Sequence, residues 1–251
     1  MAEAYSSGRW SVHNEDSVDS TQQWARRLIA SLPDRTAVLA RSQTGGRGRA
    51  GKTWLSPPGG FYCSLLLKPA PPIQFAPSVS LLAAFCLSEI MRDSGIPAMV
   101  KWPNDVVAEE LKLAGMIAET GSVPSSWFIL GIGVNLLSEP FIEGRSILPP
   151  GAWSRFCEPP SPGKLLQRLL SELDSHWPER TGSPLGSVCG LVTPRLWNLG
   201  KRVSVKSDGI GVDGVVDGID ENGFLLLSTD SGERRFVSGE LLTVHGERVQ
   251  K

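Results

Sequence analysis

The 251-residue sequence has few of the residues that staple small folds or hold metal ions, with only four cysteines and three histidines. The cysteines are widely separated and form no C-x-x-C pair, which disfavours both a zinc site and a disulfide framework. Neither sign of charge is in excess, because 25 lysines and arginines oppose 26 aspartates and glutamates. No overall field therefore draws the chain to nucleic acid or to an anionic membrane, and any basic function must be local.

Long apolar runs are also absent from the sequence. No uninterrupted apolar run approaches the ~18 residues that a membrane span needs. The opening MAEAYSSGRW lacks a basic-then-apolar signal segment. With 41% hydrophobic and 20% charged residues, the composition excludes the collagen-like, disordered and coiled-coil classes. We expect a cytoplasmic protein with reduced cysteines and no membrane contact.

Strand-like and helix-like segments mix along the first four fifths of the chain. Helices are predicted at residues 22–31 and 78–93, and a third begins at Ser161, a cap residue followed by Pro162 in the first turn. Strands are predicted at residues 36–41, 61–68, 98–102, 112–119 and 127–137. This order predicts an α+β fold, with a mixed β-sheet packed with helices.

The end of the chain contains almost only short strands and turns. Strands are predicted at residues 201–206, 214–219, 224–228, 234–237 and 241–244. Five short strands within about 50 residues fit a small β-barrel of the SH3 type. We therefore predict two domains, residues 1–198 and residues 199–251.

A glycine-rich segment, residues 45–60, matches two nucleotide-binding patterns: G-x-x-x-x-G-K-T at 46–53 and G-x-G-x-x-G at 46–51. Both patterns require a helix to begin at the glycines, so that its first amides face a phosphate. The following W-L-S-P-P-G-G cannot sustain a helix, so both interpretations are rejected.

What remains is a flexible loop that carries Arg47, Arg49 and Lys52. Glycines let the backbone approach a ligand closely, and guanidinium groups bind phosphate or carboxylate through two hydrogen bonds. The loop is therefore predicted to bind an anion. A solvated basic hairpin tip is the alternative.

Two other strand ends carry polar groups in an unusual setting. Lys101-Trp-Pro-Asn-Asp places a cation, an indole, an amide and a carboxylate where a strand ends, so that Asn104 and Asp105 lie at a turn. A turn whose polar side chains bond only local amides is the alternative.

Lys112 stands in an otherwise apolar strand, where it either reaches solvent or faces a site. Strict alternation would place Lys112 with Ala114 on one face, and Leu111 with Leu113 on the other.

The strand at residues 127–137 carries Gly131, Gly133 and Asn135 in phase, so alternation places all three on one face. A strand face without side chains is typical of the wall of a pocket for a flat ligand. Close packing of the sheet against a helix is the alternative.

Together these segments resemble the biotin protein ligase family. That family shows a D-S-T-N-Q-like stretch, Q-x-x-G-R-G-R-x-G-R-x-W-x-S-P, K-W-P-N-D, K-L-A-G and G-x-G-x-N in this order. The corresponding segments here are residues 19–23, 43–57, 101–105, 112–115 and 131–135. The departures are Gln22 for the common Asn, Lys52 for an arginine, and Leu111 for an arginine before the lysine. Lys52 keeps the charge but loses the two-pronged guanidinium.

The resemblance implies a class II synthetase-like catalytic domain at residues 1–198 and the SH3-like barrel at residues 199–251. It implies an ATP-dependent ligase that joins biotin and ATP into biotinyl-5′-AMP with release of pyrophosphate. The biotinyl group then passes to a lysine of a biotin carboxyl carrier domain. Biotin and ATP are the substrates, and Mg²⁺ is the expected companion of ATP.

The resemblance also assigns residues to roles, with metal ligands left open. The catalytic residues are Lys112, Arg47 and Arg49. The biotin-binding residues are Ser20, Thr21, Gln22, Gln43, Arg47, Gly48, Arg49, Lys112, Gly115, Gly131 and Gly133. The ATP- or adenylate-binding residues are Arg49, Lys52, Trp54, Lys101, Asn104, Asp105, Lys112 and Asn135.

Two rival functions belong to the same fold or family. Lipoate-type protein ligases share the fold and activate a related acid, but the Gly-Arg-Gly-Arg loop and Lys-Trp-Pro-Asn-Asp favour biotin. Some relatives are also DNA-binding repressors with a helix-turn-helix module of roughly 60 residues ahead of the ligase. Only 18 residues precede Asp19, so we expect no DNA partner, while a homodimer is compatible with the resemblance.

Overall fold

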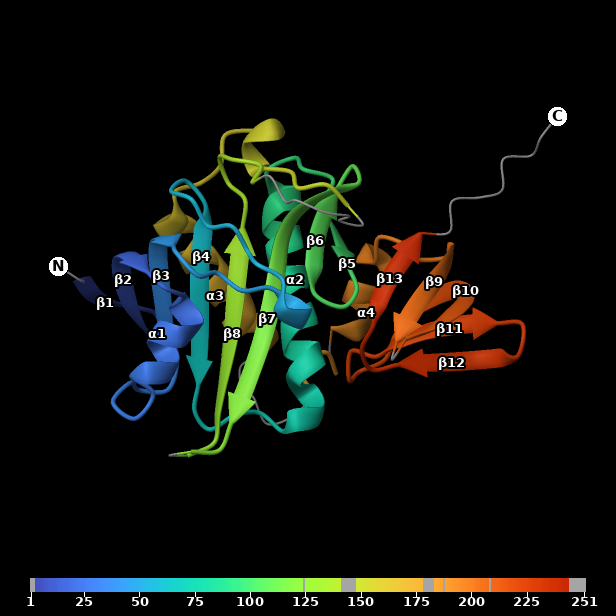
Figure 1. Cartoon of the computed structure of the whole chain (residues 1–251), viewed down its shortest axis with the longest axis horizontal. Coiled ribbons are helices and arrows are strands. Elements are labelled where there is room, and N and C mark those ends of the chain that lie inside the picture. Colours follow the sequence, from blue (N-terminus) through green and yellow to red (C-terminus); the bar gives the residue numbers. More distant parts are fainter. Residues whose placement is uncertain are drawn as a thin grey trace.

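The computed structural model describes residues 3–123, 125–140, 148–177, 183–186, 188–207 and 209–243. It contains an eight-stranded mixed sheet in the order β1-β2-β3-β4-β8-β7-β6-β5, and a five-stranded antiparallel sheet in the order β12-β11-β10-β9-β13 (Figure 1). In the large sheet β2 and β3 run parallel, and the remaining neighbours are antiparallel. This architecture confirms the predicted mixed sheet with helices and the β-rich end of the chain.

The strands of the large sheet are β1 (Glu3–Ser7), β2 (Trp10–Val18), β3 (Thr36–Gln43), β4 (Phe61–Leu67), β5 (Met99–Lys101), β6 (Asp105–Ala108), β7 (Leu111–Gly121) and β8 (Trp127–Val134). Five of them match predicted strands within a few residues. The sequence patterns did not predict β1, β2 or β6. Asp105 consequently opens a strand, and only Asn104 of the pair lies in the turn.

The three main helices are α1 (Thr21–Arg27), α2 (Ala76–Asp93) and α3 (Pro162–His176). The predicted cap of α3 is confirmed, because the Ser161 side chain accepts a hydrogen bond from the backbone N–H of Lys164. The short helical segments are η1 (Arg49–Gly51), η2 (Ile73–Phe75), η3 (Trp153–Arg155), α4 (Cys189–Val192) and η4 (Thr193–Arg195).

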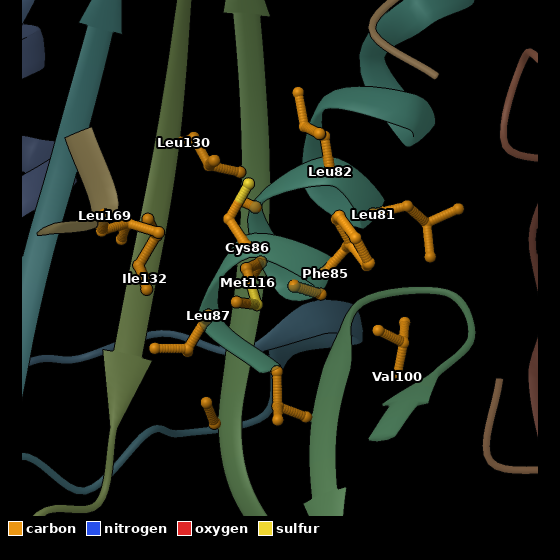
Figure 2. Packing of buried hydrophobic residues seen from close by; sticks show 14 of the residues in the cluster. Leu81, Leu82, Phe85, Cys86, Leu87, Val100, Met116, Leu130, Ile132 and Leu169 are labelled. Atoms are coloured by element: carbon orange, nitrogen blue, oxygen red, sulfur yellow. The ribbon is translucent and has the colours of Figure 1, made fainter. Parts of the chain in front are cut away.

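The main hydrophobic core lies between the large sheet and α2, with α3 packed beside it. Figure 2 shows Leu82, Cys86 and Leu87 of α2 gathered with Leu130 and Ile132 of β8. By length and composition Ile73–Asp93 is apolar enough to cross a membrane, but 67% of its most apolar window is buried inside the protein. Burial of a large apolar side chain stabilises a fold by roughly 1.5–3 kcal/mol, so this helix contributes strongly to the stability of the layer.

The opposite face of the sheet is covered only in part, by α1. A small apolar cluster joins Ala25 of α1, and Ile29 just after the helix, to Val38, Leu66 and Ile129 of the strands. The helix has only seven residues and lies against β3, β4 and β8. The face over β7, β6 and β5 is therefore left for a loop and for polar side chains.

The second sheet consists of β9 (Arg202–Ser207), β10 (Ile210–Ile219), β11 (Leu225–Thr229), β12 (Gly232–Phe236) and β13 (Glu240–Thr243). All five predicted strands are present, although the predicted end of the last, Val244, lies outside the described residues. Val205 and Leu225 of this sheet belong to the same buried cluster as α2, so one continuous core joins the two sheets.

A β-bulge in β7 changes which residues share a face with Lys112: Leu113 faces the core and Lys112 the glycine face, as expected, but Ala114 does not lie beside the lysine. Ala114 lies opposite Val106, but Lys112 lies opposite Val107, so Leu113 is an extra residue in the ladder. The extra residue inverts the alternation. Ala114 and Leu113 are fully buried in the core, whereas Lys112 shares the other face with Gly115, beside which its side chain lies.

Candidate functional site

One row of paired residues crosses five strands on the face that α1 leaves open. Lys101 pairs with Asp105, Asp105 with Gly115, Gly115 with Gly133, and Gly133 with Tyr62. Paired residues project to the same face of a sheet. The row therefore places a cation and a carboxylate at one end, an aromatic ring at the other, and a floor of two glycines between them.

The indole of Trp54 lies on this glycine floor. A Cβ added at Gly133 would lie 2.5 Å from the ring, and one at Gly115 would lie 3.2 Å from it. Only glycine at both positions allows a flat group to lie directly on the strands. The predicted surface without side chains is present, and within the protein itself Trp54 covers it.

Gly131, two residues earlier on β8, is covered from a different direction. An added Cβ there would lie 2.8 Å from the carboxamide of Gln22, whose Nε2 donates to the carbonyl of Ile117 at 3.2 Å. The close packing of helix and sheet that the sequence left as an alternative therefore applies at this glycine.

Lys112 lies at the centre of the site and makes two contacts. Its Nζ is 2.7 Å from Oδ1 of Asp105 and 5.5 Å from the centroid of the Trp54 ring. The side chains of Lys112 and Asp105 are only 28% and 15% exposed. The contact is an ion pair without the direction of a good hydrogen bond, so the ammonium has donors left for a ligand.

Lys101 is a second, more deeply buried cation of the row. It is 6% exposed, and its ammonium has no hydrogen bond or ion pair within the part of the chain that the structure describes. Burial lowers the pKa of Lys101, while the nearby charge of Asp105 opposes that shift. A buried cation without a partner is costly, and such groups concentrate at functional sites.

The three cations of the glycine loop (residues 45–57) each meet a different element. With the Gln23 amide oxygen turned toward Arg47, both terminal nitrogens of Arg47 donate to it at 2.9 Å. Arg49 donates to Oδ1 of Asn104 at 3.3 Å. Lys52 lies 3.3 Å from the carboxylate of Glu240 on β13.

The backbone of this loop is a narrow hairpin. Gly48 N–H donates to the Lys52 carbonyl at 2.7 Å, and Arg47 and Thr53 form an isolated antiparallel β-bridge. The only helical piece of the segment, which the structure describes in full, is the three-residue turn η1. Since no α-helix begins at the glycines, the rejection of both nucleotide-binding patterns is confirmed.

A chain of polar side chains lies at the start of α1. The hydroxyl of Ser64 donates to Oγ1 of Thr21 at 2.8 Å, and Thr21 donates from its own hydroxyl and backbone N–H to Oε1 of Gln43, at 3.2 and 2.9 Å. Gln43 Nε2 in turn donates to Ser56 Oγ at 2.8 Å. Such a chain of alternating donors and acceptors fixes the orientation of each of its polar groups.

The residues that precede α1 hold this start in place. Ser20 is its N-cap residue, 3% exposed, and its side chain makes no capping hydrogen bond. Asp19 accepts from the Ser20 N–H at 2.8 Å and pairs with both terminal nitrogens of Arg27. The Arg27 guanidinium lowers the pKa of Asp19 to about 2, so this clamp stays charged at neutral pH.

Sequence reasoning missed four residues of this region: Ser56, Ser64, Tyr62 and Gln23. Ser64 was the one with a visible signal, since it is a lone hydroxyl in the apolar strand F-Y-C-S-L-L-L. Tyr62 donates to the carbonyl of Pro57 at 2.7 Å and so supports the loop end. Burial raises its pKa to about 12.

A shallow, open hollow adjoins Trp54 and Lys112. In the described part of the chain, the indole nitrogen of Trp54 and Oδ1 of Asn135 are buried without hydrogen-bond partners. Asn135 is oriented by its own amide, which donates to the carbonyl of Gly151 at 3.0 Å. Two unpaired polar atoms in residues that line one hollow are typical of a binding site. The hollow is lined by Trp54, Leu55, Lys112, Asn135, Pro140, Leu148 and Pro150.

The site thus has three parts: a polar cluster at the start of α1 (Thr21, Gln43, Ser56 and Ser64), a cationic centre at Lys112, and a hollow at Trp54 and Asn135. Residues 15–135 match the model of the biotin/lipoate A/B protein ligase family, and residues 199–241 match that of the biotin protein ligase C-terminal domain. A biotin–[acetyl-CoA-carboxylase] ligase of Paracoccus denitrificans is 30% identical over 89% of this chain and 96% of its own. The chain belongs to the biotin protein ligase family.

Two further members agree with this assignment. The bifunctional ligase/repressor BirA of Bacillus subtilis is 29% identical over 90% of this chain and 72% of its own length. Biotin protein ligase from Aquifex aeolicus, solved in complex with biotin and ATP, superposes with a TM-score of 0.78 at 27% identity. That match covers 92% of this chain and 97% of the other, so both the large and the small sheet are those of the family.

Proposed function

We propose that this protein activates biotin with ATP to biotinyl-5′-AMP and then transfers the biotinyl group to a lysine of a biotin carboxyl carrier domain. The observation that carries the proposal is the position of Lys112, beside Asp105, the Trp54 ring and the glycine floor on the open face of the sheet. The relatives of this protein are biotin protein ligases by name, and one of them was solved in complex with biotin and ATP. The proposed domain boundary, between residues 198 and 199, is supported by the second family model, which begins at residue 199.

The three parts of the site match the three parts of the adenylate. The ureido ring of biotin would bond Thr21, Gln43 and the N-cap residue Ser20, since the ring offers both N–H donors and a carbonyl acceptor. The adenine would lie in the hollow against Trp54, where the unpaired Oδ1 of Asn135 accepts from an amino group. Gln22, Gly115, Gly131 and Gly133 would form the wall between the two ends.

Adenylation brings a carboxylate against the α-phosphate, and the two anions repel each other. The Lys112 ammonium would lie between them, and Arg47 and Arg49 would exchange their neutral amide partners for these anions. Asp105 would keep Lys112 aimed at the reacting atoms. Catalysis on this account is mainly positioning and neutralisation of charge.

The remaining polar groups would bind the other phosphates of ATP. Lys101 would supply a cation that has no protein partner, and Asn104 would supply an amide. Lys52 would supply a second cation from the glycine loop, whose narrow turn is closed at Gly48. In the second step the carrier amine attacks the biotinyl carbonyl, the C–O bond of the mixed anhydride breaks, and AMP leaves. The amine proton passes to solvent.

Mg²⁺ fits this site only as a companion of ATP. The described residues contain no group of three His, Cys, Asp or Glu side chains able to hold a metal ion by themselves. Mg²⁺ commonly uses one or two carboxylates together with substrate phosphates. Asp105 is the carboxylate that would contribute, and the ion would add positive charge at the phosphates.

Lipoate is the nearest alternative acid, because the family model covers both kinds of ligase. Its dithiolane ring has no N–H or carbonyl group to meet the polar chain of Thr21, Gln43 and Ser64. That chain therefore favours biotin. Isothermal titration with each acid alone compares the two directly.

The decisive experiment incubates the protein with ATP, biotin and a carrier domain, and weighs the carrier by mass spectrometry. We expect the mass of one biotinyl group to appear on the carrier, and pyrophosphate to form only when biotin is present. Labelling by lipoate but not biotin would replace the proposal with its alternative. Absence of any biotin-dependent pyrophosphate would overturn it.

A further inference from the structure

A buried hydrogen bond joins the turn at residues 101–105 to the C-terminal sheet. The indole nitrogen of Trp102 donates to the backbone carbonyl of Gly223 at 3.0 Å, and Trp102 is only 2% exposed. Trp102 directly follows Lys101 and precedes Asn104 by two residues. The bond therefore ties a turn that carries polar groups of the site to a distant part of the chain.

The acceptor of this bond is firmly held. Gly223 lies in the turn between β10 and β11 with φ +82°, which favours glycine. Its N–H donates to the Asp220 carbonyl at 2.9 Å, which closes the turn. An added Cβ would lie 3.0 Å from both the backbone nitrogen of Ser78 and a methyl group of Leu81. The turn is thus seated against the start of α2, and its carbonyl has little freedom to move.

The other end of the 101–105 turn is held by β7. Met116 N–H donates to the Asn104 carbonyl at 2.9 Å, and the Asn104 side chain donates back to the Met116 carbonyl. Trp102 supplies the matching attachment on the opposite side of the turn. Lys101 itself is paired with Asp105 in the sheet, and the Trp102 bond adds a side-chain attachment of the turn to the C-terminal sheet.

We propose that Trp102 is a positioning residue for ATP and that it acts through Gly223 of the C-terminal sheet. The proposal rests on the proposed function, in which Lys101 and Asn104 bind the phosphates. The Lys101 ammonium has no protein partner of its own among the described residues, so the backbone on either side of it must fix its position. Preorganised charge of this kind loses effect when its support moves by even a small distance.

The test replaces Trp102 by phenylalanine, which removes the N–H donor and retains a large aromatic ring. We expect the KM for ATP in biotin-dependent pyrophosphate release to rise about three- to tenfold, the effect of one lost hydrogen bond. The Kd for biotin measured without ATP should not change, because Thr21 and Gln43 lie at the other end of the site. A general loosening of the fold would instead raise both the KM for ATP and the Kd for biotin.

Trp127→Phe is the matched control. The Trp127 indole also donates to a backbone carbonyl at 3.0 Å, that of Val123, but within the hairpin of β7 and β8. This variant loses the same bond and the same ring area, and its KM for ATP should stay at the wild-type value.

Gly223→Ala provides a second, independent variant that retains Trp102 and displaces the acceptor. It should raise the KM for ATP in the same direction, and the double variant should be no worse than the more affected single variant. If Trp102→Phe does not fold, as judged by circular dichroism, Gly223→Ala decides the matter alone. A wild-type KM for ATP in the folded variants, or an equal rise in the biotin Kd, overturns the proposal. A wild-type protein with no biotin-dependent pyrophosphate release would instead overturn the proposed function.

Discussion

Lys112 and Asp105 lie side by side on one face of the sheet, with Nζ of the lysine 2.7 Å from Oδ1 of the aspartate. They share that face only because the bulge at Leu113 shifts the pairing of β7 with β6 by one residue. The carboxylate thereby holds the ammonium over the glycine floor and near the Trp54 ring before any substrate arrives. A cation held in this way needs little reorganisation during the reaction.

Replacement of Lys112 by methionine should slow adenylation by ~10²–10³, the usual effect of losing one preorganised charge. The melting temperature should change little, because methionine retains most of the stem and no large apolar surface is lost. Pyrophosphate release measures the rate. Lys206→Met, at an exposed strand lysine of β9, is the control. Near-normal adenylation by Lys112→Met would mean that the active site is misplaced.

Thr21→Val tests the polar cluster at the start of α1. Valine has nearly the shape of threonine, but it removes the hydroxyl that joins Gln43 to Ser64, and it leaves the fully buried Ser64 hydroxyl without its acceptor. We expect the Kd for biotin to rise roughly tenfold to a hundredfold, the equivalent of one or two lost hydrogen bonds. Isothermal titration without ATP measures it.

Thr36→Val is the control for the previous variant. Thr36 is also fully buried and donates to a backbone carbonyl, that of Pro33, at 2.8 Å. It lies at the start of β3, away from the polar cluster, so its loss should reduce stability without changing the biotin Kd. Equal changes in biotin Kd for the two variants would remove Thr21 from the binding site.

How far the sequence predicts this molecule depends on whether a feature is local. The cap of α3 and the five strands of the C-terminal sheet were predictable, since a cap residue with proline and short alternating segments between turns act over a few positions. The hairpin of β6 and β7 was not predictable, because its turn residues Glu109 and Glu110 both have positive φ and are not residues that usually mark such a turn. Such turns usually show Asn-Gly or Asp-Gly, so no turn signal marked the strand.

The candidate site follows the same division. The motifs identified Lys112, Trp54 and the glycines, and alternation placed the glycines on one face, but the sequence did not show what covers them. The bulge that turns Lys112 toward Gly115 depends on pairing with β6, and no periodicity reveals it. Likewise the sequence could not tell that Gly133 accepts an indole while Gly131 accepts the Gln22 side chain, because both neighbours come from distant segments.

Gly133→Ala should displace the Trp54 indole, since the added Cβ would lie 2.5 Å from a rigid ring. Overpacking of this kind costs about 1–3 kcal/mol, and we expect the KM for ATP to rise at least about fivefold, with a shift in tryptophan fluorescence. Gly163→Ala is the control, because an added Cβ in that first turn of α3 has nothing within 4 Å. An unchanged KM for ATP in Gly133→Ala would show that Trp54 does not border the nucleotide.

Lys101→Met should make the protein more stable and less able to use ATP. Lys101 is 6% exposed as a residue, and burial lowers the pKa of its ammonium, so an apolar side chain of similar length removes a desolvation cost. We expect a gain of roughly 1–3 kcal/mol in the free energy of unfolding at pH 7, together with a KM for ATP at least about tenfold higher. Opposite changes in stability and function are typical of a group kept for binding.

The pH dependence of that gain has a definite sign. Burial lowers the pKa of Lys101 in the folded protein below its ordinary value of 10.5. At a pH between the lowered pKa and 10.5, Lys101 is therefore protonated in the unfolded chain and largely neutral in the folded protein. Wild-type stability therefore rises with pH in that window, relative to a variant that lacks the group. Urea unfolding from pH 7 to pH 10 should show the stability gap between Lys101→Met and wild type narrowing as the pH approaches 10.5. Lys201→Met, at an exposed lysine, should show no such gap. A Lys101→Met variant that is less stable than wild type at pH 7 and binds ATP normally would return Lys101 to a structural role.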